Sequence, residues 1–416
     1  GNINLQVRPQ TDTALALGIM NLMFENDEYD HEFAETWIYG LDEMKERAAE
    51  YPVDKVAEIT TVPAEDIKRA AHIIGTERPI GWAWGLAFDQ NKNGVQLSQA
   101  FIILAALAGS IDRPGGLTLG PPSALLGKWR MEQRGAMTDE VWSKRIGAEE
   151  WPGLSTGMST TQPDETLNTM ETHQPYQLRF AWFNSSNFLA PTCSAQPKRW
   201  HDALCESIEC CVVQDIMQTP TSMAVGDYFL PISTWAEHNG IVLTHYGRNT
   251  VFMGPMNKAL QVGECKSDLE ICLMFGQRLN PEWWPWYKPA DGKSLDLDAL
   301  QVAVENFFSD QLKELGFDWK TFQELGLYQP GAHGFEYEKY EKGLLRFDGQ
   351  PGFNTITGQI EAYSILYESW GEDPLPYYEE PNFSQISKPD LAEQYPLITT
   401  SGSRRYSSFH SEHRHV

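Results

Sequence analysis

The sequence has few cysteines, few basic residues and no long apolar run, and each absence excludes a class of protein. Its 6 cysteines include no Cys-x-x-Cys pair and no iron–sulfur or zinc spacing. A disulfide framework is also not expected in a chain of 416 residues with so little cysteine. The 32 basic residues are outnumbered by 57 acidic ones, giving a net charge of −25, which argues against a nucleic-acid surface. No apolar stretch is long enough to predict a membrane span.

The two ends of the sequence resemble the interior of a longer protein. Gly1 is followed at once by sequence typical of the middle of a domain, and the given sequence does not open with a signal-peptide pattern. The chain stops at Val416 without a terminating element. We therefore expect a central fragment of two or three domains, whose intact form is either cytoplasmic or exported across a bacterial inner membrane.

The stretch from 211 to 240 predicts a strand–helix–strand unit with polar residues at the strand ends. Cys211, Val212 and Val213 form an apolar run typical of a buried strand, and Gln214 and Asp215 follow it directly. A second apolar run covers Tyr228–Pro231, and Glu237 and His238 come soon after. In doubly wound sheets ligands lie beyond the carboxyl ends of the strands. These four polar residues are therefore candidates for ligand contacts.

Neighbouring segments predict further helices and strands. Strands are expected at 4–8, at the start of 78–93, at 178–183 and within 355–365. Helices are expected from about Thr11 to Asn26, from Pro63 to a terminating Gly75, and over 94–110, 198–206 and 307–325. The segment 178–232 thus predicts a βαβ unit extended by a further strand, and Cys210 and Cys211 are expected to be structural thiols in one of its strands.

The ordered pattern VVQDI…T…A…D…LP…T…E…G in the stretch from 211 to 240 resembles the molybdopterin oxidoreductases of the DMSO reductase family. That resemblance implies an α/β fold with two doubly wound dinucleotide-binding-like domains, each built on a parallel sheet, and the start of a C-terminal β-barrel domain. The domains are expected at 1–137 and 178–390, with an irregular insertion near a substrate funnel at 138–177 and the beginning of the barrel at 391–416.

The resemblance also implies the cofactor, a bis-molybdopterin guanine dinucleotide that holds molybdenum or tungsten. Gln10, Thr11 and Asp12 match a turn that holds one guanine, because a carboxylate accepts from both the ring N–H and the amino group. Leu86 and Gln90 match positions near the pterin, although Ala87 replaces a common glycine.

The second half supplies further matches. Asn184 and Ser185 match a turn against guanosine, Gln214 and Asp215 a nucleotide-contacting pair, His238 a position often held by Lys or His, and Asp268 an acid that binds the second guanine. The matches to the pterin and its phosphates are Ser401, Gly402, Arg404, Arg405, Ser408, His410 and Ser411.

Several of these residues also have a purely structural explanation. Thr11 or Asp12 could cap the first helix, and Asp268 could cap a helix over 269–279. Gln90 could be an ordinary loop residue, Asn184–Ser185 an ordinary turn, and His238 a solvated side chain.

The catalytic residues are not identified in this sequence. In the family the metal ligand lies in a segment before the position that matches Gly1, and none of the cysteines here has its context. The resemblance allows a [4Fe–4S] cluster held by segments outside this chain and an iron–sulfur electron-transfer subunit as a partner.

The sequence favours an oxidoreductase that performs two-electron chemistry on a small molecule at the metal. The segment 237–268 is most similar to branches that catalyse aromatic dehydroxylation, transhydroxylation or hydration. A non-catalytic scaffold subunit of a redox complex remains the alternative. A nicotinamide or flavin dehydrogenase is disfavoured, because no Gly-x-Gly-x-x-Gly turn follows a strand.

Overall fold

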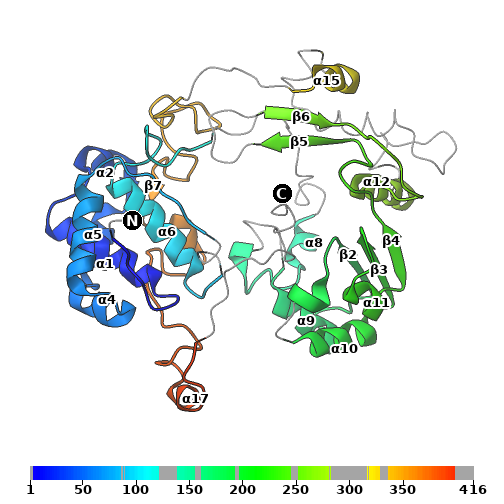
Figure 1. Cartoon of the computed structure of the whole chain (residues 1–416), viewed down its shortest axis with the longest axis horizontal. Coiled ribbons are helices and arrows are strands. Elements are labelled where there is room, and N and C mark those ends of the chain that lie inside the picture. Colours follow the sequence, from blue (N-terminus) through cyan, green and yellow to red (C-terminus); the bar gives the residue numbers. More distant parts are fainter. Residues whose placement is uncertain are drawn as a thin grey trace. The chain divides into compact units, whose positions relative to one another are not determined.

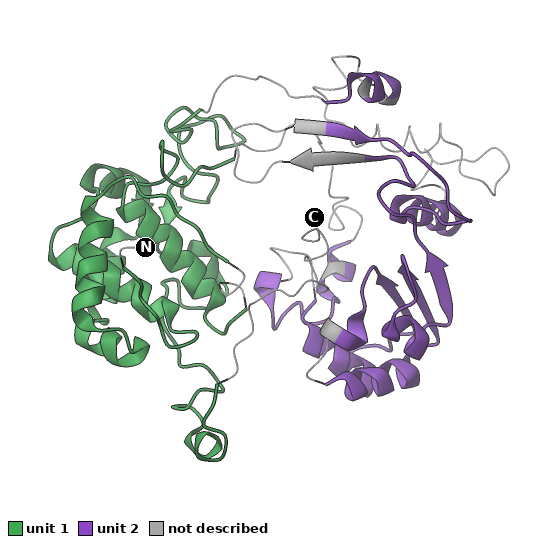
Figure 2. Cartoon of the chain, in the orientation of Figure 1, with its two compact units in different colours: residues 1–122, 247–249, 334–416 green, residues 123–246, 250–333 purple. Residues whose placement is uncertain are grey.

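The structure is a computed structural model that describes residues 3–85, 88, 90–120, 138–154, 161–192, 196–244, 252–280, 282, 316, 318–327 and 336–398. The chain divides into two compact units (Figure 2). Unit 1 comprises residues 1–122, 247–249 and 334–416, and unit 2 comprises 123–246 and 250–333. None of the helices in the described ranges has the length and apolar character needed to cross a bilayer.

Unit 1 is mainly helical where it is described, and its helices surround α1. Helix α1 is apolar on nearly every side and packs against α3, α4, α5 and α6. In its described ranges the helices are α1 (Asp12–Glu25), α2 (His31–Trp37), α3 (Leu41–Ala49), α4 (Val53–Thr60), α5 (Ala64–Thr76), α6 (Gly94–Leu107), α16 (Ile365–Ser369) and α17 (Pro389–Gln394). The described strands β1 (Ile38–Tyr39) and β7 (Ile360–Glu361) pair in parallel.

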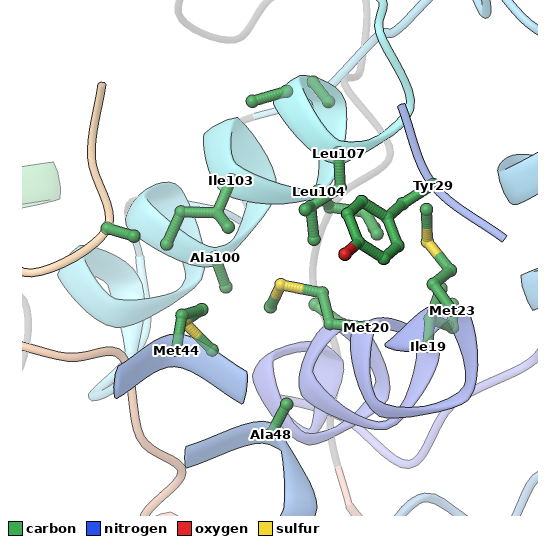
Figure 3. Close-up of a cluster of buried hydrophobic side chains, with 14 of the residues drawn as sticks. Ile19, Met20, Met23, Tyr29, Met44, Ala48, Ala100, Ile103, Leu104 and Leu107 are labelled. Carbon is green, nitrogen blue, oxygen red and sulfur yellow. The ribbon is translucent and has the colours of Figure 1, made fainter. Parts of the chain in front are cut away.

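The core of unit 1 lies between α1, α3 and α6. Met20 and Met23 of α1, Leu104 and Leu107 of α6, and Met44 of α3 belong to one buried cluster (Figure 3). Apolar burial of this kind stabilises a fold by roughly 25 cal/mol for each Å² removed from water. This core, and not a large sheet, therefore holds the described part of unit 1 together.

Two predicted strands of unit 1 are absent from the described residues. The segment 4–8 has no strand neighbour; the amide of Arg8 donates instead to the carbonyl of Thr60. The segment 78–85 has no ladder either, and the amide of Ile80 donates to the Ser110 hydroxyl. The expected strand within 355–365 is confined to β7. The doubly wound form expected for 1–137 is therefore not confirmed.

The segment 336–398 belongs to unit 1, although the sequence placed 336–390 with the second α/β half and 391–398 at the start of the barrel. Lys339 and Asp112 form a fully buried ion pair, with 2.6 Å between Nζ and Oδ1. Next to it, the Tyr340 ring stacks on Phe353 and meets Phe33 and Trp37 edge to face. An ion pair and an aromatic cluster thus fasten this late segment to the early helices.

Unit 2 is built on a sheet of three parallel strands in the order β2–β3–β4 (Figure 1). The strands are β2 (Phe180–Asn184), β3 (Cys210–Asp215) and β4 (Tyr228–Pro231), and they are joined through the π-helix η3 (Phe188–Thr192), α10 (Pro197–Ser207) and α11 (Pro220–Val225). This arrangement confirms the extended βαβ unit expected for 178–232. Cys211 is buried in β3 as expected, whereas Cys210 is partly exposed.

The rest of unit 2 extends this sheet and adds a separate ribbon. Ile232 forms a parallel bridge with Lys266, directly before α12 (Asp268–Leu279). Strands β5 (Gly240–Thr244) and β6 (Phe252–Met256) form an antiparallel pair. Other helices in the described ranges are α8 (Asp139–Ser143), α9 (Pro163–Thr172) and α15 (Trp319–Leu325). Helix α15 lies within the helix expected over 307–325, of which residues 307–315 and 317 are outside the described residues.

Candidate cofactor-binding site

The carboxyl ends of β2, β3 and β4 lie side by side and bring several predicted residues together. Asn184 pairs in register with Gln214, and Asp215 pairs with Pro231. Beyond β2 the chain turns at Ser185, whose amide donates to the Gln214 carbonyl at 2.8 Å. Ser185 has a φ of +49°, a left-handed backbone conformation that is rare for residues other than glycine. Such local strain at a sheet edge is typical of functional turns.

Gln214 is completely buried and both ends of its amide are bonded. The Trp182 indole donates to Oε1 at 2.8 Å, and Nε2 donates to Oδ1 of Asp268 at 2.7 Å. Because Asp268 follows Gln214 by 54 positions, this bond joins the end of β3 to the start of α12. The structure thus brings two predicted site residues, Gln214 and Asp268, into direct contact at the carboxyl end of β3.

Asp268 is not the cap of α12, which was its structural alternative. Ser267 is the cap: its hydroxyl accepts from the Glu270 amide, and the Glu270 carboxylate accepts from the Ser267 amide. This reciprocal pair is a capping box. Asp268 occupies the first helical residue, where the helix dipole favours a negative charge. Its carboxylate is therefore available for another role.

Asp215 and His238 lie on the same edge and are held by neighbours in their own loops. One carboxylate oxygen of Asp215 accepts from the Ile216 amide at 2.8 Å. Nδ1 of His238 lies 2.9 Å from the hydroxyl of buried Ser233, which follows β4. Glu237, by contrast, accepts from the amide and hydroxyl of Thr234, and these bonds lower the pKa of its carboxyl. Glu237 therefore stabilises its own turn.

In unit 1 the predicted turn at the start of α1 is present. Gln10 has a φ of +67°, and the hydroxyl of buried Thr11 donates to the Arg8 carbonyl at 2.6 Å. Thr11 occupies the cap position but makes no side-chain capping bond. Burial raises the pKa of the Asp12 carboxyl, and its own backbone amide partly opposes this shift. No side chain in the described ranges donates to Asp12, so the carboxylate is open to a ligand donor.

Arg8 holds this turn from behind. Its guanidinium binds both carboxylate oxygens of Glu380, at 2.6 and 2.8 Å, and donates to the Ile59 carbonyl at 2.9 Å. The Tyr378 hydroxyl completes the cluster at 3.2 Å. Three separate segments of unit 1 therefore determine where the turn from Gln10 to Asp12 lies.

The other predicted residues are less informative. Gln90 is an exposed residue in a bend. Leu86 and the C-terminal positions Ser401, Gly402, Arg404, Arg405, Ser408, His410 and Ser411 lie outside the described residues. Within the described ranges no group of three or more His, Cys, Asp or Glu side chains is arranged to hold a metal ion.

Sequence reasoning missed two residues of the site, Trp182 and Ser267. A signal existed for Ser267, because a serine followed three residues later by glutamate predicts a capping box. Recognising it would have separated Asp268 from the capping role. No sequence signal distinguishes Trp182, since a tryptophan within an apolar strand is typical of packing.

The two sets of residues have the chemistry that a guanine dinucleotide requires. Asp268 in unit 2 and Asp12 in unit 1 each present a carboxylate that no described cation neutralises. Guanine offers two adjacent N–H donors, and carboxylates are acceptors only. Asn184 and Ser185 add small polar groups beside Asp268's partner Gln214. The residues present therefore fit the nucleotide ends of the cofactor.

Comparison with known proteins agrees with this chemistry. The family model described as molybdopterin oxidoreductase matches residues 3–277. The chain is 30% identical to acetylene hydratase of Syntrophotalea acetylenica, over 99% of this chain and 55% of that protein. It is also 30% identical to dopamine dehydroxylase of Eggerthella lenta, over 89% of this chain and 42% of that protein.

A solved structure extends the likeness to the fold. Acetylene hydratase from Pelobacter acetylenicus matches with a TM-score of 0.80 and 28% identity, over 98% of this chain and 55% of that one. The chain thus spans about half the length of these relatives. Taken with the strand-end residues, the match over residues 3–277 shows that the chain belongs to the molybdopterin oxidoreductase family, of the DMSO reductase type.

Proposed function

We propose that this chain forms the nucleotide-binding part of a molybdenum or tungsten enzyme that uses a bis-molybdopterin guanine dinucleotide. The observation that carries the proposal is the cluster at the carboxyl edge of the unit 2 sheet, where Asp268 is bonded to buried Gln214 and released from helix capping. Ligands of parallel sheets bind at this edge. Family membership supports the same cofactor independently.

Each unit would hold one nucleotide end of the cofactor. In unit 2 Asp268 would accept from a guanine, with Asn184, Ser185, Asp215 and His238 near the ribose and phosphates. In unit 1 Asp12 would accept from the other guanine, in the turn formed by Gln10 and Thr11. The bound metal would supply two-electron chemistry to the substrate, while these residues bind and orient the cofactor.

The substrate class follows from the two named relatives. A hydratase and a dehydroxylase both handle water or a hydroxyl group, and both match this chain at 30% identity. We therefore propose a small molecule that gains or loses water or a hydroxyl group. Profiling the anaerobically purified full-length gene product against alkynes and against hydroxylated aromatic compounds tests this; activity on neither class, with the cofactor present, contradicts it.

The remaining parts of the chain have proposed roles that accompany this function. Residues 138–177 would line the approach of the substrate, and 391–416 would begin a pterin-binding barrel. A [4Fe–4S] cluster on segments outside this chain and an iron–sulfur partner subunit would carry electrons. Iron and acid-labile sulfide in the purified full-length protein, and any subunit that copurifies with it, test these two points.

The decisive experiment is the metal and pterin content of the full-length gene product, purified without oxygen. Elemental analysis for Mo and W is combined with fluorescence of the oxidised pterin. We expect one of the two metals, with pterin in excess of metal as a bis-pterin cofactor requires. A folded protein that contains neither would overturn the proposal and favour the alternative, a scaffold subunit that retains the fold.

A matched pair of variants connects this measurement to the site. Asp268→Asn keeps the side-chain volume but replaces one acceptor oxygen by a donor, so we expect the pterin content to fall severalfold. Glu264→Gln makes the same chemical change on an exposed residue shortly before α12 and should leave the content unchanged. Equal pterin content in both variants would contradict the role of Asp268.

A further inference from the structure

We propose that Gln214 is a positioning residue and not a nucleotide contact: with Trp182 it forms a relay that aims the Asp268 carboxylate at the base. This inference rests on the proposed function and deepens it, because it names what gives the unit 2 site its preference for a base with two donors. It also changes the role that the family resemblance implies for Gln214.

The indole of Trp182 determines the orientation of the Gln214 amide. An indole N–H can only donate, so the atom 2.8 Å from it must be the amide oxygen. The amide nitrogen then faces Asp268, whose carboxylate can only accept, and the distance between them is 2.7 Å. In the reversed amide, the nitrogen would face the indole N–H, which is also a donor, and the oxygen would face the Asp268 carboxylate, which is also an acceptor. One arrangement alone therefore satisfies all three side chains.

This arrangement leaves Gln214 no means of reaching a nucleotide with its side chain. The residue has no exposed surface, and both polar ends of its amide are already bonded. A buried amide that loses such a partner is destabilised by about 1–3 kcal/mol. Binding a ligand through this amide would require breaking one of these bonds, whereas Asp268 can bind without breaking either.

The relay holds the Asp268 carboxylate in place and leaves acceptor sites on both of its oxygens. Gln214 donates to Oδ1, which can accept a second hydrogen bond, and Oδ2 has no partner among the described residues. Because the amide is neutral, it fixes the carboxylate without cancelling its charge. An arginine or lysine at this position would cancel it. Guanine presents a ring N–H and an amino group on one edge, and both can donate to such a carboxylate. Adenine has an acceptor in place of the ring donor, so it should bind less well.

Packing of α12 on the sheet supports the relay. The Trp182 ring lies 4.7 Å from the Phe275 ring, centroid to centroid, and Phe275 is on the same helix as Asp268. Trp182 therefore fixes α12 through an aromatic contact and fixes Gln214 through a hydrogen bond. Side chains locked in this way hold a binding group in a single geometry.

The test measures binding of GDP and ADP to the cofactor-free full-length gene product by calorimetry. We expect the wild-type protein to prefer GDP. Gln214→Met, which keeps the length of the side chain and removes both bonds, should weaken GDP binding about tenfold and leave ADP binding unchanged. Gln214→Glu should do the same, because a second carboxylate would repel that of Asp268. Asp268→Asn gives the reference for complete loss of preference.

A double-mutant cycle distinguishes positioning from a general structural effect. Trp182→Phe keeps most of the ring packing and removes the indole donor, so the GDP preference should fall about threefold or more. The same change made on top of Gln214→Met should have no further effect on the preference, because Trp182 acts through Gln214. If Gln214→Met fails to fold, as judged by circular dichroism, the comparison is made in Gln214→Leu, which also removes both bonds.

The outcomes separate this inference from the proposed function. Equal weakening of GDP and ADP binding in Gln214→Met, or no weakening of either, overturns the relay while leaving the nucleotide site in place. Independent effects of Trp182→Phe and Gln214→Met overturn it as well. A wild-type protein without preference for GDP overturns the proposed guanine site itself, and the relay with it.

Discussion

Asp112 shows how this protein accommodates a charge that is fully removed from water. It has a left-handed backbone with a φ of +52°, and its carboxylate accepts from Lys339 Nζ, from the Lys339 amide and from the Leu119 amide. Buried charges persist only when they are paired and hydrogen-bonded. The cluster therefore serves as the fastening point of the segment that begins at 336.

Removing one partner of this pair should be strongly destabilising. In Lys339→Met the Asp112 carboxylate stays buried without its counter-ion, and we expect a loss of about 3–5 kcal/mol in the free energy of unfolding. Urea unfolding measures this. Adding Asp112→Asn to Lys339→Met removes the buried charge and should restore part of the loss. If Lys339→Met were as stable as the wild type, the stabilising role of the buried ion pair would be contradicted.

Glu380 should make the stability of unit 1 depend on pH. The Arg8 guanidinium lowers the pKa of this carboxyl to about 2. A depressed pKa in the folded state means that the stabilisation is present above the unfolded pKa, about 4.3, and is lost as the pH falls towards 2. We expect a loss of about 2 kcal/mol over this range, measured by urea unfolding at several pH values.

A matched pair of variants tests the source of that pH dependence. Glu380→Gln should be less stable at neutral pH and should lose most of the decline between pH 4.3 and 2. Glu379→Gln changes the neighbouring carboxyl, which pairs with Lys92 and not with Arg8, and should keep the decline. A decline of equal size in both variants would assign it to other groups.

At the scale of the element, α5 shows how a correct helix prediction can assign the wrong role to a residue. The helix begins at Ala64, one residue after the expected start at Pro63, but it continues to Thr76 and Gly75 lies inside it. Gly75 does not end the helix. A Cβ at this position would lie 2.3 Å from the Glu28 carbonyl oxygen, so the glycine permits a close approach of the chain after α1. Tertiary packing therefore explains why position 75 is a glycine.

Gly75→Ala should therefore destabilise the protein, although alanine is the better helix former. Propensity alone predicts a gain of about 1 kcal/mol. The clash with a backbone carbonyl, which cannot rotate away, should reverse the sign and give a net loss of about 1–3 kcal/mol in urea unfolding. Gly85→Ala, where a Cβ meets nothing within 4 Å, is the control and should be close to neutral.

At the scale of the whole molecule, unit 1 is assembled from distant parts of the chain. Its early helices and its segment from 336 to 398 share one core, which includes Phe33 and Tyr340. Tyr340 is among the largest completely buried side chains, and its ring stacks 5.3 Å from that of Phe353. Neither segment can complete this core alone.

Tyr340→Ala should separate the late segment from the early helices. Removing a buried aromatic ring leaves a cavity and typically lowers the free energy of unfolding by about 3–5 kcal/mol. Tyr340→Phe keeps the ring and should lose far less. Urea unfolding compares the two variants. If both lose the same amount, the hydroxyl and not the ring carries the contribution.

Part of the unit 2 site was predictable because strand-end polarity is a local signal. The apolar run 211–213 followed by Gln214 and Asp215 predicts a strand and its carboxyl end, and the structure confirms β3 there. The strands predicted at 4–8 and at the start of 78–93 are absent from the described residues, because a short extended segment becomes a strand only if a neighbour pairs with it. Which neighbour is present depends on contacts far along the chain.

The sequence by itself determined the family and the βαβ core of unit 2 and predicted Gln214 and Asp268 as site residues, because each depends on residue order or on periodicity within a short window. Tertiary structure alone decided which groups those two residues contact. It joined Trp182, Gln214 and Asp268 across three elements, and it moved the segment from 336 to 398 into unit 1. The physical reason is that hydrogen-bond donors, acceptors and apolar surface are satisfied by whichever groups become neighbours in space, and sequence separation does not limit that choice.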